Sequence, residues 1–271
     1  MRIGVLGCAG RMGRAVIGEV LAAEACTLAG GVDQSDHPAL GQDLGTLAGE
    51  GPVGVAASDD AVGVIERSDV VIEFSAPEAT VVYVALAARH GTGHVIGTTG
   101  LSETQEQAIR EAARRTAIMR AANMSLGVNL LLGLTEQVAR ALGAEAFDIE
   151  ILEMHHRHKV DAPSGTALAL GQAAARGRDV DLSAAADRGR DGLTGARKTG
   201  AIGFAALRGG DVVGDHVVIF AGTGERIELA HRATDRRIYA QGAVTAARWL
   251  DGRPPGLYGM ADVLSLTGAR P

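Results

Sequence analysis

A short run of histidines that ends in a lysine is the group of side chains best suited to chemistry in this sequence. Three of the eight histidines are His155, His156 and His158, and Lys159 follows them directly. An imidazole gains and loses a proton near physiological pH, and an ammonium group can donate a proton or attract a carboxylate. The segment therefore predicts proton chemistry on a substrate that carries negative charge.

Two other interpretations of the histidine run stay open. Histidine is a frequent zinc ligand, but His155 and His156 point to opposite faces of an extended chain, and no Cys spacing or HExxH motif completes a site. We therefore expect no metal. The second alternative is a solvated basic loop that has no part in chemistry.

The segment directly downstream has the features of a helix start that can bind a carboxylate. Residues 161–166 read DAPSGT and lead into residues 167–175, a run rich in Ala and Leu with high helix propensity. Ser164 or a neighbour is expected to cap this helix. Free backbone N–H groups at its start, with the hydroxyls of Ser164 and Thr166, favour an acidic ligand. An ordinary capped helix start is the alternative.

A glycine-rich segment lies where a strand would pass into a helix. Residues 7–13 read GCAGRMG, between a strand-like run at 3–6 and a helical pattern at 12–21. At such a turn, backbone N–H groups and the helix dipole can meet a pyrophosphate. The spacing GxxGxxG departs from the common GxGxxG, so a plain tight turn is the alternative. Asp33, 20 residues beyond Gly13, can accept hydrogen bonds from an adenosine ribose and favours a dinucleotide site.

Asp33 also indicates which nicotinamide cofactor the site prefers. A carboxylate at this place repels a 2′-phosphate, and the next residue, Gln34, supplies no compensating positive charge. We therefore expect NADH to be favoured. Arg11 can still reach a 2′-phosphate, so NADPH stays an alternative cofactor.

A second glycine-bearing loop, GTTG at residues 97–100, follows a strand-like run at 94–96. The carboxyl edge of a parallel sheet is where open α/β folds bind ligands, so this loop can line the nicotinamide. The alternative is a turn before a helix capped by Ser102, with Glu103 and Glu106 in its first turns.

The pattern of apolar runs predicts an α/β fold. The N-terminal runs, at 3–6, 28–32, 70–74 and 95–96, alternate with helical patterns as in parallel βαβ units. Later, apolar and polar residues alternate over 147–151, and runs at 217–220 and 226–230 flank a glycine-bearing turn, so a second, mixed or antiparallel sheet is expected. The weak periodicity of residues 176–199 predicts a loop with one short helix. The helical pattern at 241–250 predicts a helix that returns to the first domain.

Composition and charge exclude several classes of protein. The 271 residues are 46% hydrophobic and 3% aromatic, which favours two domains with cores of Ala, Val, Leu and Ile. The formal charge of −6 without a dense basic block argues against a nucleic-acid partner. Because neither a long apolar stretch nor a leader is evident, we expect no membrane partner and a cytoplasmic location. Cys8 and Cys26 are expected to be buried apolar residues.

Several long strings in the sequence match motifs of one known family. They are GCAGRMGR at 7–14, GTTG at 97–100, AANMSLGVN at 121–129, MHHRHKVDAPSGTA at 154–167, RGGD at 208–211, VGDH at 213–216, ERIE at 225–228 and His231. The fourth string fits the motif HHxxKxDAPSGTA. Across nearly its whole length the chain resembles the dihydrodipicolinate reductase family.

The resemblance implies a role for individual residues. His155 is expected to be a proton donor or acceptor and Lys159 the proton donor, without any metal. The substrate carboxylates are expected to bind His156, Ser164, Gly165 and Thr166. The expected cofactor-binding residues are Gly7, Cys8, Ala9, Gly10, Arg11, Met12, Asp33, Gly97, Thr98, Thr99, Ala121, Ala122, Asn123 and Met124.

The family also implies a domain organisation and a reaction. Residues 1–122 plus 240–271 are expected to form a Rossmann dinucleotide-binding domain, and residues 123–239 an inserted α+β domain that binds substrate and mediates homotetramer formation. The implied reaction is NAD(P)H-dependent reduction of 4-hydroxy-tetrahydrodipicolinate, via dihydrodipicolinate, to tetrahydrodipicolinate in lysine and diaminopimelate biosynthesis. The alternatives are another Rossmann-fold amino-acid or semialdehyde dehydrogenase and a non-enzymatic NAD-sensing protein.

Overall fold

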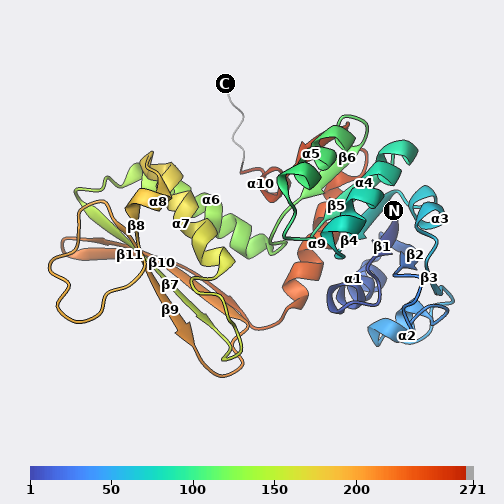
Figure 1. The fold of residues 1–271 in the computed structure, drawn as a ribbon, viewed down its shortest axis with the longest axis horizontal. Helices are drawn as coiled ribbons and strands as arrows, with labels where there is room; N and C mark the ends of the chain where they lie inside the picture. The colour runs from blue at the N-terminus through green and yellow to red at the C-terminus, as the bar shows by residue number, and fades with distance from the viewer. Residues whose placement is uncertain (267–271) are drawn as a thin grey trace. The chain divides into compact units, whose positions relative to one another are not determined.

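The chain forms two compact units in the computed structural model, which describes residues 1–266. One unit comprises Met1–Leu126 with Arg237–Pro271, and the other comprises Gly127–Arg236 (Figure 1). The last part of the expected C-terminal return, residues 267–271, lies outside the described residues.

The first unit is built on a parallel sheet with the strand order β12-β6-β5-β4-β1-β2-β3. Every pairing in it is parallel. The strands are β1 (Arg2–Leu6), β2 (Thr27–Val32), β3 (Ala57–Ser58), β4 (Val70–Glu73), β5 (Gly93–Ile96), β6 (Ala117–Arg120) and β12 (Gly256–Tyr258). The direction of the strand order changes between β1 and β4, and open α/β sheets bind ligands at such a point, beyond the carboxyl ends of the strands.

Helices cover both faces of this sheet, as the alternation of apolar runs predicts. Val5 on β1 packs in one core cluster with Val16 and Ile17 of α1, whereas the next residue, Leu6, packs in another cluster with Val64 of α3. The helices on the first face are α1 (Arg11–Ala22), α2 (Leu44–Ala48) and α9 (Arg237–Leu250). Those on the second face are α3 (Ala61–Glu66), α4 (Pro77–His90) and α5 (Glu103–Ala112). A short helix, α10 (Met260–Val263), follows β12.

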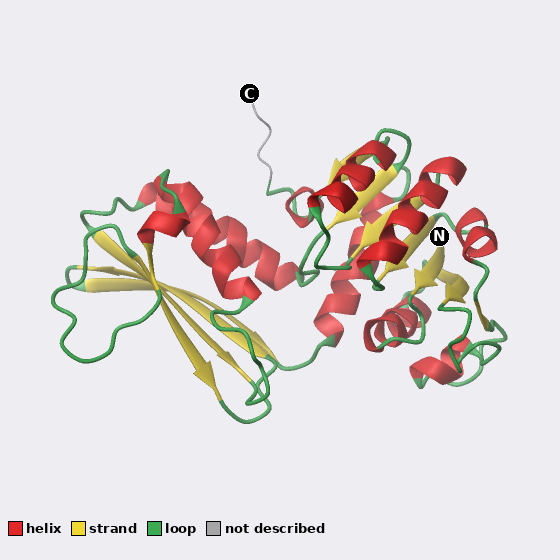
Figure 2. Cartoon of the chain, in the orientation of Figure 1, coloured by secondary structure: helices red, strands yellow, loops and turns green. Residues whose placement is uncertain are grey.

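The second unit contains a mixed sheet with the strand order β11-β10-β7-β9-β8. Its strands are β7 (Phe147–His155), β8 (Ala186–Asp187), β9 (Ile202–Arg208), β10 (Gly214–Gly222) and β11 (Glu225–Ala233). Pairings of β10 with β7 and β11 are antiparallel, and those of β9 with β7 and β8 are parallel. Three helices, α6 (Leu126–Ala141), α7 (Gly165–Arg178) and α8 (Leu182–Ala185), lie on one face of the sheet, and no helix within the described residues of this unit covers the other face (Figure 2).

The local predictions for the second unit are confirmed. The alternation at 147–151 belongs to β7, where every second residue from Ile149 to His155 is buried. The predicted hairpin is formed by β10 and β11. The weakly periodic segment at 176–199 contains the short helix α8 and the two-residue strand β8. Ser164 caps α7, accepting a hydrogen bond from the backbone N–H of Ala167.

Candidate active site

The turn between β1 and α1 brings the main chain into very close contact with a neighbouring strand end. Gly7 adopts a φ of 80°, and a Cβ at this position would overlap the carbonyl oxygen of Phe74. The N–H groups of Gly7 and Cys8 both donate to the carbonyl of Val32, at 2.8 and 3.0 Å. Glycine is therefore required for a turn this tight.

The start of α1 has the free donors that an anion requires. Gly10 occupies the N-cap without a side-chain hydrogen bond. Among the described residues, the backbone N–H groups of Arg11, Met12 and Gly13 have no acceptor, because the first helical bond is donated by Arg14 to Gly10. These N–H groups and the helix dipole fit a pyrophosphate group.

Asp33 and Cys8 lie beside this turn, but only Asp33 has an accessible polar side chain. One Asp33 carboxylate oxygen accepts from Ala9 N at 2.8 Å and the other from Gln34 N at 3.0 Å. Cys8 is fully buried, and desolvation, followed by the charge of Asp33, raises the pKa of its thiol to about 12. Any contact of Cys8 with a cofactor would use its backbone. Cys8 and Cys26 are both buried and free, as predicted.

The loops after β5 and β6 present only some of their predicted residues to solvent. The Thr98 hydroxyl is buried and donates to Glu73 Oε1 at 3.0 Å, whereas Thr99 is exposed. Met124 is 2% exposed and belongs to the core, whereas Ala122 is exposed. The predicted Ser102 cap of α5 is also present, so the loop at 97–100 both precedes a capped helix and lies at the ligand-binding edge of the sheet.

In the second unit, His155 is held by an acidic residue of its own strand. His155 Nδ1 lies 2.6 Å from Glu153 Oε2, and residues two apart on a strand share a face. Glu153 is 1% exposed. Burial by itself would raise the pKa of Glu153, but hydrogen bonds from Arg208, His155 and Ser164 N hold that pKa below its usual value. The carboxylate is therefore ionised and accepts the Nδ1–H of His155, which leaves Nε2 as the nitrogen able to exchange a proton.

Glu153 also joins three elements of the unit. Arg208, at the end of β9, donates to both oxygens of Glu153 at 2.8 and 2.9 Å. Ser164 N, at the start of α7, donates to the same carboxylate at 3.1 Å. The position of His155 is thus tied to both β9 and the N-terminus of α7.

The Ser164 side chain, predicted to bind a substrate carboxylate, is buried at the start of α7. It is 2% exposed, and besides capping α7 it lies 3.1 Å from His216 Nε2. Desolvation, followed by the charge of His155, lowers the pKa of His216 to about 4, so this ring is neutral at physiological pH. Ser164 therefore fixes the first turn of α7, whose accessible residues are the exposed Gly165 and the half-buried Thr166.

Of the predicted site residues in this segment, His156 and Lys159 are half-buried, whereas His155 is buried. Lys159 Nζ pairs with Asp161 Oδ1 at 2.8 Å and its side chain is 21% exposed. Desolvation, followed by the positive charges of Arg236 and the neighbouring histidines, lowers the pKa of His156. All predicted substrate residues lie in the second unit, and all predicted cofactor residues lie in the first.

Comparison with known proteins identifies the family. Residues 1–124 match the model of the dihydrodipicolinate reductase N-terminus, and residues 127–264 match that of the C-terminus. The chain belongs to the dihydrodipicolinate reductase family. It is therefore a pyridine-nucleotide-dependent reductase, as the motif resemblance predicted.

Relatives of this reductase match over almost the full chain. The 4-hydroxy-tetrahydrodipicolinate reductase of Parvibaculum lavamentivorans is 57% identical over 267 residues, covering 98% of each chain. The protein of the same name from Brucella abortus is 55% identical over 266 residues, covering 98% of this chain and 99% of that one. A dipicolinate-bound dihydrodipicolinate reductase from Paenisporosarcina sp. TG-14 shares the fold, with a TM-score of 0.77, 23% identity and coverage of 97% of this chain and 98% of that one.

Three residues of the reductase's second unit were not predicted to act at the site: Glu153, Arg208 and His216. Glu153 carries a detectable signal, because it lies two residues before His155 on a strand. Arg208 and His216 lie on other strands, and both belong to the motif strings at 208–211 and 213–216. Those motifs did not reveal which residues they contact, because the contacts are made between strands.

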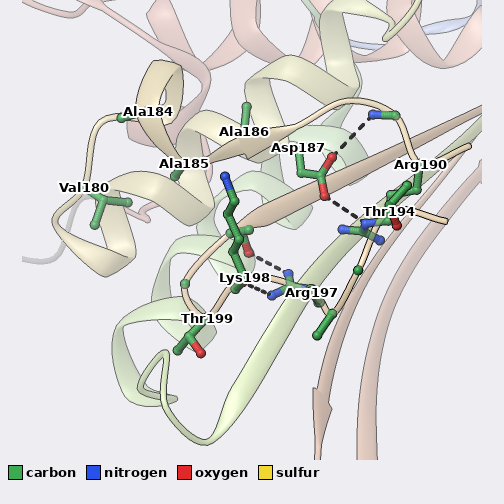
Figure 3. A pocket seen from close by; sticks show the side chains of 15 residues that line it. Val180, Ala184, Ala185, Ala186, Asp187, Arg190, Thr194, Arg197, Lys198 and Thr199 are labelled. Atoms are coloured by element: carbon green, nitrogen blue, oxygen red, sulfur yellow. Dashed lines mark hydrogen bonds and ion pairs between the residues drawn. The ribbon is translucent and has the colours of Figure 1, made fainter.

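A cavity of about 560 Å³ in the second unit lies apart from the His155–Lys159 segment and is lined by residues 180–201 (Figure 3). Its two arginines are already paired, since Arg190 contacts Glu150 and Asp187, and Arg197 also contacts Glu150, each at 2.8 Å. This cavity is not the predicted substrate site. Within residues 1–266, no group of three or more His, Cys, Asp or Glu side chains is arranged to hold a metal, and no helix is long and apolar enough to cross a membrane.

Proposed function

We propose that this reductase converts 4-hydroxy-tetrahydrodipicolinate, via dihydrodipicolinate, to tetrahydrodipicolinate in lysine and diaminopimelate biosynthesis. The observation that carries the proposal is the Glu153–His155 pair, in which Glu153 sets the tautomer of the imidazole and also accepts a hydrogen bond from Ser164 N at the start of α7. A sensor that only binds a dinucleotide has no use for such a pair. Full-length relatives of the same name support the choice of substrate.

The first unit is proposed to bind the cofactor. The free N–H groups at the start of α1 would hold the pyrophosphate, Asp33 the adenosine ribose, and the exposed edges of the loops at 97–99 and 121–124 the nicotinamide half. NADH is favoured over NADPH, because the Asp33 carboxylate repels a 2′-phosphate and Gln34 adds no positive charge. When bound, the dihydronicotinamide supplies a hydride to the conjugated C=C–C=N system of the substrate.

The second unit is proposed to bind the substrate and supply a proton. The cyclic dicarboxylate would place its carboxylates against His156 and against the backbone N–H groups of Gly165 and Thr166, where the helix dipole of α7 favours negative charge. Negative charge that develops on the substrate after hydride arrival is then quenched by a proton from Lys159 or His155. Ser164 contributes by fixing the first turn of α7.

A homotetramer and a cytoplasmic location complete the proposal. The face of the second sheet that lacks helices carries Leu207, 47% exposed, and half-buried Leu152, Met154 and Val217 on adjacent strands. Such a face is suited to packing against a second copy of the chain. Light scattering that gives the mass of four chains would support the tetramer, and a monomer at micromolar concentration would contradict it.

The first test is the decay of dihydronicotinamide absorbance when the enzyme meets freshly formed substrate. The substrate is made from pyruvate and aspartate semialdehyde by the preceding synthase, and parallel reactions contain NADH or NADPH. Rapid oxidation with the lower Michaelis constant for NADH is expected. An enzyme that is folded and binds NADH but does not oxidise it would point to another Rossmann-fold dehydrogenase.

A further inference from the structure

A fully buried carboxylate lies at the carboxyl end of β4, outside the machinery proposed above. Glu73 and its neighbour His94, on β5, are both 0% exposed. Glu73 Oε2 lies 2.9 Å from His94 Nε2. Its other oxygen, Oε1, accepts from the hydroxyls of Ser75 and Thr80 at 2.5 Å and from Thr98 at 3.0 Å. Four donors from four places in the chain therefore converge on one side chain.

The charge on Glu73 fixes the direction of these hydrogen bonds. Burial alone would raise its pKa, but His94, Ser75 and Thr80 outweigh burial and lower it. An ionised carboxylate only accepts, so the Thr98 hydroxyl must donate to it. The Thr98 oxygen is then free to accept, and it takes the backbone N–H of Ser75 at 3.0 Å. This chain of two bonds connects the loop after β4 to the loop after β5.

Phe74 extends the same assembly to the glycine-rich turn after β1. A Cβ on Gly97 would overlap the ring of Phe74, and a Cβ on Gly7 would overlap the carbonyl oxygen of Phe74. The loop after β4 is therefore in contact with the loops after both β1 and β5 at the carboxyl edge of the sheet. Glu73 is hydrogen-bonded to the loops after β4 and β5.

A buried carboxylate is not needed to stabilise a strand of this kind. The preceding residues of β4 are Val70, Val71 and Ile72, all fully buried, and another apolar residue would continue the pattern. Burying an ionised group costs several kcal/mol, and replacing such groups by apolar ones is often neutral or stabilising. What the four hydrogen bonds that converge on Glu73 do provide is a single local geometry, although Nδ1 of His94, the other ring nitrogen, has no hydrogen-bond partner among the described residues.

We infer that Glu73 is a positioning residue for cofactor binding, which turns Thr98 inward and leaves Thr99 to face the dinucleotide. The two threonines of the loop at 97–100 thereby have separate roles. Thr99 is exposed, and its hydroxyl has no partner among the described residues. The identity of the ligand rests on the proposed function, whereas the geometry of the loop does not.

The test compares two threonines at opposite ends of β5. Thr98→Val removes the hydroxyl that joins Glu73 to Ser75, and Thr98→Ser keeps it. Thr92→Val is the matched control, because Thr92 is also buried, 4% exposed, and donates one hydrogen bond, to Ile65 O at 2.9 Å. NADH affinity is measured from dihydronicotinamide fluorescence without substrate, and stability from the melting temperature.

Thr98→Val is expected to raise the Kd for NADH about tenfold, the effect of about one misplaced hydrogen bond. Thr98→Ser should restore it, and Thr92→Val should lower the melting temperature without changing the Kd. If Thr98→Val does not accumulate as folded protein, Glu73→Gln, which keeps the shape and removes the charge, is expected to weaken NADH binding in the same way.

Two results would overturn the inference: an unchanged Kd in folded Thr98→Val or Glu73→Gln protein, or equal changes in Kd for Thr98→Val and Thr92→Val. Failure of the wild-type enzyme to bind NADH would refute the proposed cofactor, and with it the positioning role. Normal NADH binding without reduction of the cyclic imine would refute only the proposed substrate and leave the role of Glu73 standing.

Discussion

His155 Nδ1 and Glu153 Oε2 lie 2.6 Å apart, and Arg208 holds the same carboxylate with two hydrogen bonds of 2.8 and 2.9 Å. When one ring nitrogen of a histidine is hydrogen-bonded to a carboxylate, the imidazole has a fixed tautomer and a fixed orientation. The free nitrogen, Nε2, is then ready to accept a proton or, after protonation, to donate it. Arg208 keeps Glu153 ionised and so preserves this arrangement.

Glu153→Gln is expected to lower kcat about 100-fold, the usual contribution of a positioned acid or base. In the glutamine side chain an NH₂ group replaces one of the two accepting oxygens. This NH₂ group then faces another hydrogen-bond donor, on either His155 or Arg208. NADH affinity should not change, because the cofactor residues lie in the other unit. Glu136→Gln is the control, since Glu136 pairs with Arg140 and Arg176 on helices of the same unit. A normal kcat in Glu153→Gln would show that the Glu153 carboxylate does not position His155 for proton transfer.

Lys159→Ala is expected to lower kcat by about 100-fold or more while leaving the Kd for NADH unchanged. Removing a proton donor affects the transition state rather than cofactor binding. The ammonium group is accessible and is held by Asp161 at 2.8 Å. Lys198→Ala, at the cavity of the same unit, removes the same charge and should have normal kinetics. Equal turnover in the wild type and in Lys159→Ala would remove Lys159 from the mechanism.

Structural features that depend only on residues close to one another in the sequence could be predicted. The strand, glycine-rich turn and helix at residues 2–22 are encoded locally, and so is the Ser164 cap of α7. The motif at 121–129 does not indicate where α6 begins. In the structure Met124 belongs to the core and α6 begins at Leu126, inside the motif. The short elements α2 and β3 lie in a glycine-rich, weakly periodic segment that predicts neither.

Contacts between distant strands could not be predicted. Arg208 meets Glu153 across 55 residues, and His216 meets Ser164 across 52. Both contacts depend on the register of β7 with β9 and β10, where Arg208 pairs with His155 and His216 with Glu153. A motif identifies candidate residues, but only the structure shows that Ser164 is buried and that its hydroxyl caps α7.

His156→Ala is expected to raise the Michaelis constant for the dicarboxylate about tenfold with a small change in kcat. The ring attracts a carboxylate when protonated, and desolvation with the nearby positive charges lowers its pKa. The wild-type Michaelis constant for the dicarboxylate should therefore increase as pH rises through a range below the ordinary histidine pKa. The Michaelis constant of His156→Ala should not show this increase. Steady-state kinetics at several pH values checks both points. An effect confined to NADH affinity would contradict the assignment.

Gln34→Arg is expected to lower the Michaelis constant for NADPH about tenfold and to change that for NADH little. Gln34 is exposed and directly follows Asp33, so a guanidinium there can pair with a 2′-phosphate. Gln107→Arg, on the exposed surface of α5, adds the same charge elsewhere in the unit and serves as the control. If both variants improve NADPH use equally, the effect is one of overall charge and the role of position 34 is refuted.

His216 should make the stability of the enzyme depend on pH. In the folded protein its pKa is lowered to about 4, chiefly by desolvation, whereas an imidazole in the unfolded chain takes up a proton near pH 6.5. Between these values the unfolded state binds more protons, so the free energy of unfolding falls as pH falls. From pH 7 to pH 5 this one residue accounts for a loss on the order of 2 kcal/mol.

The measurement compares the wild type with His216→Gln, whose amide can still reach the Ser164 hydroxyl but does not titrate. Denaturant unfolding at pH 7, 6 and 5 gives the difference in free energy of unfolding between the two proteins. Glu153 and His231 titrate in both, so their contributions largely cancel in the difference. The wild type should lose its advantage over His216→Gln as the pH falls. A difference that stays constant from pH 7 to pH 5 would mean that His216 is not held neutral in the folded enzyme.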